Sequence, residues 1–133
     1  MGINLSHNKL KKLGVEIVYL FGSQAEGMAG KLSDIDIGVV FEGGQSPKDS
    51  REIYNKLYDL FTDVFDMREY KVMDIVFLDR ASLELRFDVI SHGKVLYESS
   101  TEVREDFEHR TAMLYMDFKP ILNNFDRAVL DRV

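Results

Sequence analysis

Short runs of β-branched and aromatic residues alternate along the chain with longer segments in which apolar residues recur every three or four positions. Continuous apolar runs that end at glycine or polar residues are typical of buried strands. Apolar residues three and four positions apart share one face of a helix. This pattern predicts strands at residues 15–21, 35–41, 72–78 and 94–98, with helices before, between and after them.

Two of the predicted helices lie in the first half of the chain. A short helix is expected at residues 4–13, a segment with three leucines that is followed by a glycine. Ser46 followed by Pro47 is typical of a helix start, because proline at the first helical position lacks only an N–H that would have no partner there. We therefore expect the second helix to begin at Pro47 and to present one apolar stripe to the core as far as Phe65.

The second half of the chain carries two further helical patterns. Asp79 or Ser82 can cap a third helix, which should end near Gly93. From Thr101 onward the chain is expected to be helical, with Pro120 kinking or dividing the helix because proline removes a backbone hydrogen bond. Strands that alternate with helices predict an α/β (α+β) fold, in which a mixed sheet is flanked by helices on one side and followed by C-terminal helices.

Length and composition indicate a single domain. With 133 residues, of which 45% are hydrophobic, the chain can bury one core of ordinary size. We expect one domain over residues 1–133, with a core at about 15–98 and a C-terminal helical segment at about 101–133. No uncharged apolar run approaches the roughly 20 residues that span a bilayer, and the N-terminal segment lacks the apolar region of a signal peptide. A cytoplasmic protein without membrane contact is therefore expected.

Charge and cysteine content narrow the possible partners and ligands. The net charge is −6, whereas domains that bind nucleic acid on their own usually carry a basic face, so independent nucleic-acid binding is not expected. The chain contains no cysteine, which excludes disulfides, zinc–thiolate sites and thiol nucleophiles. Any metal ion must then be held by oxygen or imidazole ligands. Composition does not settle the oligomeric state, and a homo-oligomer stays possible.

The most informative segment is GSQAEGMAGKLSDIDIG, residues 22–38. A predicted strand ends at Gly22 and Ser23, and Asp34 and Asp36 open the next strand. Because strand side chains alternate, these two carboxylates point to the same face of the sheet. Glycine allows the backbone to approach a phosphate closely, and a serine at a strand-to-helix turn offers a hydroxyl and an amide. A Gly-Ser turn or an Asp-x-Asp junction alone would be commonplace, but the spacing and strand context together indicate a site.

Two further residues belong to this hypothesis. Asp74 lies within the apolar run VMDIVFL, where an aspartate is unfavourable unless it serves a site; the alternative is a plain strand residue. Ser33 is either an ordinary turn residue or a contact to nucleotide. Hard oxygen ligands suit magnesium, and two Mg2+ ions about 3.5–4 Å apart can neutralise a triphosphate and activate a hydroxyl. Three neighbouring carboxylates would repel one another without such cations.

With these residues in this order, the chain resembles the polymerase β-like nucleotidyltransferases, whose signature is Gly-Ser, a spacer of about this length, Asp-x-Asp and a later strand carboxylate. It is similar in particular to the minimal nucleotidyltransferases, the MNT proteins, which are paired with a HEPN partner. The resemblance covers residues 15–98. It implies that two Mg2+ ions are bound by three catalytic aspartates: Asp34, Asp36 and Asp74.

The same resemblance implies further roles. Asp74 would also orient or deprotonate the acceptor hydroxyl, and Gly22 and Ser23 would hold the triphosphate. The implied reaction transfers a nucleoside monophosphate, AMP from ATP, to a hydroxyl, with a tyrosine of a cognate HEPN toxin as acceptor; the chain would then be an antitoxin. Glu26 departs from the family pattern, because many members carry arginine there and a carboxylate cannot pair with phosphate. The alternative is a catalytically weak or inactive module that neutralises a HEPN partner by docking.

One further spacing has a simpler explanation. Arg104 and His109 match the Arg-x4-His spacing of HEPN ribonucleases, but they lie in the charged run REDFEHR. The remainder of the chain does not have the pattern of a helical bundle. We interpret this run as the solvated face of a helix.

Overall fold

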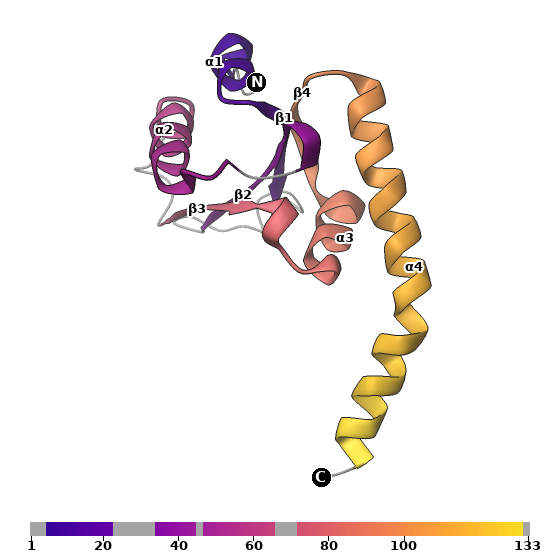
Figure 1. Ribbon diagram of the computed structural model, residues 1–133. Helices are drawn as coiled ribbons and strands as arrows, with labels where there is room; N and C mark the ends of the chain where they lie inside the picture. The colour runs from indigo at the N-terminus through magenta and orange to yellow at the C-terminus, as the bar shows by residue number, and fades with distance from the viewer. Residues whose placement is uncertain (1–4, 23–33, 45–46, 66–71, 132–133) are drawn as a thin grey trace.

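The computed structural model describes residues 5–22, 34–44, 47–65 and 72–131, with residues 122–131 described as backbone only (Figure 1). Its helices and strands follow the predicted order. They are α1 (His7–Lys12), β1 (Val15–Phe21), β2 (Ile35–Phe41), α2 (Ser50–Thr62), β3 (Met73–Phe77), α3 (Leu83–His92), β4 (Lys94–Glu98) and α4 (Thr101–Asp131), with short 3-10 turns η2 (Glu42–Gly44) and η3 (Leu78–Arg80). All four predicted strands are present. β1, β2 and β4 have the predicted bounds, and β3 is one residue shorter at each end than predicted.

The four strands form one mixed sheet in the order β3-β2-β1-β4. β1 pairs antiparallel with both β2 and β4, and β2 pairs parallel with β3. The first residues of β2 and β3 therefore lie at the same end of the sheet as the last residues of β1. This arrangement confirms the predicted α+β class with a mixed sheet. It also gathers Gly22 and the three aspartate positions of the sequence motif at one end of the sheet.

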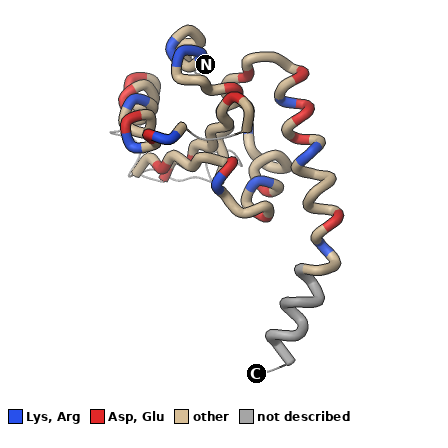
Figure 2. The backbone as a smooth tube through the Cα atoms, viewed as in Figure 1, with Lys and Arg blue, Asp and Glu red and all other residues tan. Residues whose placement is uncertain are grey.

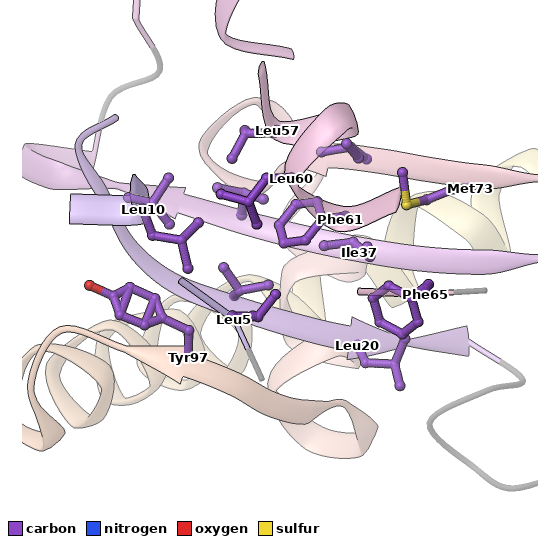
Figure 3. Close-up of a cluster of buried hydrophobic side chains, with 14 of the residues drawn as sticks. Leu5, Leu10, Leu20, Ile37, Leu57, Leu60, Phe61, Phe65, Met73 and Tyr97 are labelled. Atoms are coloured by element: carbon purple, nitrogen blue, oxygen red, sulfur yellow. The ribbon is translucent and has the colours of Figure 1, made fainter. Parts of the chain in front are cut away.

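Helices cover both faces of the sheet, so the prediction of helices on one side is wrong. On one face, buried residues of α1 and α2 pack with the alternate residues of the strands, as in the cluster around Phe61 and Ile37 (Figure 3). On the other face, Tyr19, Leu78 and Val89 form a second cluster against α3 and α4. The physical reason is visible in the sequence, because β1 and β2 are apolar at almost every position and are buried on both faces.

Two predicted helix starts can be compared with the structure. α2 begins at Ser50 and not at Pro47, because the side chain of Asp49 accepts a hydrogen bond from the amide of Glu52 at 3.3 Å and so provides the N-cap. Ser46 lies outside the described residues. For α3, Ser82 is the cap, with its hydroxyl accepting from the amide of Leu85 at 3.1 Å.

α4 is one helix from Thr101 to Asp131 that continues through Pro120, so the helix is not divided there. A proline inside a helix removes one backbone hydrogen bond, and here the turns on both sides remain helical. The first half of α4 packs on the sheet and on α3, and the second half projects beyond the domain (Figure 1). Within the part of the chain that is described, no helix combines the length and apolar character needed to cross a bilayer.

The first half of α4 is held to the sheet by a partly buried polar network. Arg104 pairs with Glu98 of β4 through Nε and with Glu108 through Nη1 at 3.1 Å. The hydroxyl of Tyr19 in β1 donates to Glu108 at 3.1 Å, and burial, followed by the charge of Glu108, raises the pKa of Tyr19. Arg104 thus ties three elements together, which supports a structural role, while His109 is exposed.

Candidate active site

The three aspartates of the sequence motif lie at one end of the sheet. Asp36 is the second residue of β2 and Asp74 is the second residue of β3, and the two are paired in register across the parallel ladder. Residues paired in this way point to the same face of a sheet, so the two carboxylates are neighbours. Asp34 immediately precedes β2, two residues from Asp36. The register between β2 and β3, which the sequence does not contain, is what places Asp74 beside Asp36.

Burial and charge act together on the central carboxylate of this group. Asp36 is half-buried, whereas Asp34 and Asp74 are exposed. Burial raises the pKa of Asp36 above its usual value, and the negative charges of Asp74 and then Asp34 raise it further. The two flanking carboxylates are therefore close enough to destabilise the ionised form of Asp36. A bound cation would relieve this repulsion.

Gly22 brings the end of β1 against the same carboxylate. Its φ of +73° lies in the left-handed region that favours glycine, and a Cβ built on it would be 2.5 Å from Oδ2 of Asp36. The sequence pointed to Gly22 as a residue that lets a phosphate approach. The structure adds a second reason for glycine, because its missing side chain makes room for Asp36.

The face that carries Asp36 and Asp74 becomes apolar along the strands. Val40 and Val76 lie on this face in contact with the cluster beneath α3 and α4, and Leu78 packs over Gly38, where an added Cβ would lie 3.0 Å from the leucine side chain. The carboxylates thus lie beside this buried apolar layer, at the end of the sheet where β2 and β3 begin.

Several predicted site residues cannot be compared with the structure. Ser23 and Ser33, proposed to contact nucleotide, lie outside the described residues, as does Glu26. Within the described ranges, no group of three His, Cys, Asp or Glu side chains is gathered closely enough to hold a metal ion. The chemistry of the donors nevertheless fits Mg2+, because all three are hard oxygen ligands. Burial raises the pKa of Asp36, the charges of Asp74 and Asp34 raise it further, and a cation would offset both effects. The assignment of two Mg2+ ions to Asp34, Asp36 and Asp74 stays a prediction.

Several solved structures are similar to this chain in fold. A chain from a toxin–antitoxin complex crystallised with AMP-PNP is 27% identical, with a TM-score of 0.67, over 95% of this chain and 99% of that chain. A chain from the complex of a tri-AMPylated Shewanella oneidensis HEPN toxin with an MNT antitoxin is 25% identical, with a TM-score of 0.62, over 92% of this chain and 94% of that chain. A chain from the MntA–HepT toxin–antitoxin complex, 23% identical with a TM-score of 0.64 over 92% of both chains, shows the fold alone.

Comparison with protein families gives the assignment. No curated protein shows a significant match to the chain. The family model described as "Polymerase beta, Nucleotidyltransferase" matches residues 5–102, from the residue before the cap of α1 to the first turn of α4. This match includes the whole sheet and the three aspartates. The chain therefore belongs to the polymerase beta nucleotidyltransferase family.

Proposed function

We propose that the protein is an Mg2+-dependent nucleotidyltransferase that transfers AMP from ATP to a tyrosine hydroxyl of a HEPN toxin and thereby acts as its antitoxin. One observation carries this proposal. Asp36 and Asp74 are paired in register at one end of the sheet, with Asp34 two residues away and Gly22 against the Asp36 carboxylate. Family membership supplies the class of reaction.

The residues of the site have different roles in the proposed transfer. Asp34, Asp36 and Asp74 would hold two Mg2+ ions, which when bound neutralise the triphosphate and make the acceptor hydroxyl more nucleophilic. Asp74 would also orient that hydroxyl or accept its proton. The acceptor oxygen forms a bond to the α-phosphorus, the bond from the α-phosphorus to the bridging oxygen breaks, and pyrophosphate leaves. Gly22 and Ser23 would hold the triphosphate, and Ser33 would contact the nucleotide.

The choice of nucleotide and acceptor has separate support. One similar chain comes from a toxin–antitoxin complex with AMP-PNP, an ATP analogue. Another comes from a complex whose HEPN toxin is AMPylated. Both are at least 25% identical to this chain and cover more than nine tenths of it. These likenesses favour ATP as donor and a HEPN protein as acceptor.

The projecting half of α4 supports a protein partner. Its described part has few charged positions (Figure 2) and exposes large apolar side chains: Met113, Leu114, Met116, Phe118 and Ile121. Contiguous exposed apolar surface is typical of protein–protein interfaces. Because the match to the chain from the AMP-PNP complex covers 95% of this chain, it includes most of α4. We therefore assign this surface to the HEPN partner.

The second candidate function is neutralisation by docking alone, and the same exposed surface of α4 favours it. The two functions separate in one experiment. The purified protein is incubated with ATP, Mg2+ and its cognate HEPN protein, and the intact mass of the HEPN protein is measured. The enzyme predicts a mass gain of whole AMP units, which requires Mg2+ and is lost in Asp36→Asn. A toxin that is neutralised without any mass gain would leave docking as the function and contradict the transferase.

A further inference from the structure

A groove of about 610 Å3 runs along the outer edge of β3, and its described lining does not include the three aspartates. One wall is the first turns of α2, which lie beside β3 in Figure 1, and the other wall is η3 and the residue after it. Its described lining consists of Ser50, Arg51, Tyr54, Asn55, Ile75, Val76, Phe77, Arg80 and Ala81. The proposed transfer uses none of these residues.

The backbone of β3 offers hydrogen-bonding groups to this groove. β3 is the edge strand of the sheet, and its inner side bonds to β2, where the amide of Ile35 donates to the carbonyl of Val72 at 2.8 Å. Backbone groups of alternate residues point to opposite sides of a strand, so those of Ile75 and Phe77 are directed outward. An edge strand with outward N–H and C=O groups can pair with another extended chain.

The side chains of the groove define the chemistry of such a chain. Tyr54 and Phe77 form an aromatic floor with ring centres 6.3 Å apart. The described lining carries two charges, and both are arginines, although the chain as a whole has a net charge of −6. Arg80 is held in place, because its guanidinium donates to the carbonyl of Pro47 at 3.3 Å and lies 5.8 Å from the ring centre of Phe77. The groove therefore favours apolar side chains on its floor and acidic ones at its rim.

The groove and the candidate active site share one strand. Asp74 immediately precedes Ile75, and a strand rises about 3.3 Å per residue. A segment paired with Ile75 and Phe77 would therefore continue past Asp74 within one or two residues. A hydroxyl carried by that segment could reach the carboxylate that is assigned to the acceptor.

We propose that the groove binds the protein acceptor as an extended, acidic segment that adds to the outer edge of β3. Main-chain bonds to Ile75 and Phe77 set its position, and its carboxylates pair with Arg51 and Arg80. This inference rests on the proposed function, because it names where the acceptor of that reaction is bound. It makes Arg51 and Arg80 determinants of acceptor specificity, and it separates the acceptor from the nucleotide, which is assigned to the Gly22 side of the carboxylates.

The first test reverses both charges of the groove in the variant Arg51→Glu/Arg80→Glu. Its matched control is Lys48→Glu/Lys56→Glu, which changes the net charge by the same amount near the same helix but outside the described lining. With the cognate HEPN protein as acceptor, we expect the groove variant to raise the KM for that protein about tenfold, with kcat and ATP affinity unchanged. The control should stay within about twofold, and unfolding curves should show that both variants are folded.

The second test follows the backbone amides directly. In amide hydrogen exchange with AMP-PNP present, the HEPN protein should slow exchange in residues 73–77, and the groove variant should abolish this protection. The outcomes separate the two proposals. Protection of β3 without any AMP transfer would support the groove and contradict the transferase. AMP transfer with an unchanged KM in the groove variant, or AMP transfer without protection of β3 in the wild type, would overturn the groove proposal alone. A loss of ATP affinity in the groove variant would show that the two arginines bind nucleotide and would also overturn it.

Discussion

Replacing Gly22 by alanine should disable the site while leaving the fold largely intact. Gly22 has a φ of +73°, and an added Cβ would lie 2.5 Å from Oδ2 and 3.4 Å from Cγ of Asp36. Favourable contacts between carbon atoms lie at about 3.5–4.0 Å, so a methyl group at this position would clash with the carboxylate. Either the Asp36 side chain must rotate away or the end of β1 must shift.

The structure separates two costs of this substitution. The left-handed conformation costs an L-residue other than glycine about 1–2 kcal/mol. Displacement of Asp36 acts on activity, since a misplacement of about 1 Å at a reacting centre can lower the rate about 100-fold. We therefore expect Gly22→Ala to lower the free energy of unfolding by about 1–2 kcal/mol and to lower kcat by about 100-fold.

Gly14 provides the matched control. Its φ is +78°, and an added Cβ would meet nothing within 4 Å. Gly14→Ala should carry the same backbone cost without touching Asp36. Urea unfolding measures the free energies, and the rate of AMP transfer to the HEPN protein measures activity. The reasoning is refuted if Gly22→Ala keeps the wild-type rate, or if Gly14→Ala loses as much activity as Gly22→Ala.

Three further expectations can be measured with the same assays. The pKa of Asp36 is higher in the folded state than in the unfolded state. The stability that this residue contributes is therefore present below its unfolded-state pKa and is lost as the pH rises through its folded-state pKa. In metal-free thermal unfolding, Asp36→Asn should not show this loss of stability with rising pH. Adding Mg2+ at neutral pH should stabilise the wild type more than Asp36→Asn, and equal shifts would argue against metal binding there. The side chain of Ile121 is 61% exposed, and Ile121→Asp should weaken the binding of the HEPN protein about tenfold or more, as measured by calorimetry. The control Lys119→Asp should leave the affinity unchanged, and equal losses in both variants would place the interface elsewhere.

The strands were predictable because their signals are local. β1, β2 and β4 have the predicted bounds, since each is a mainly apolar segment between glycine or polar residues. The end of α3 at Gly93 and its cap at Ser82 follow from equally local rules. The predicted start of α2 was wrong because Pro47 and Asp49 both satisfy rules for helix starts. The hydrogen bond from the amide of Glu52 to the side chain of Asp49 decides between them.

The site was predictable in part. Asp34 and Asp36 share a face because of the two-residue period of a strand, and Asp74 was conspicuous in an apolar run. The register that pairs Asp36 with Asp74 depends on contacts between distant segments, which periodicity does not encode. The groove could not be predicted from periodicity either, because Arg51 and Arg80 line one groove only when α2 and η3 both border β3.

The transfer of label from ATP to the HEPN protein tests the central claim most directly. ATP labelled on the α-phosphate and ATP labelled on the γ-phosphate are supplied in parallel, each with Mg2+ and the wild-type protein. We predict that the HEPN protein acquires the α label and none of the γ label, and that Asp74→Asn abolishes the transfer. Transfer of the γ label would identify a kinase, and transfer of neither label in the presence of an active HEPN toxin would contradict the nucleotidyltransferase assignment of this site.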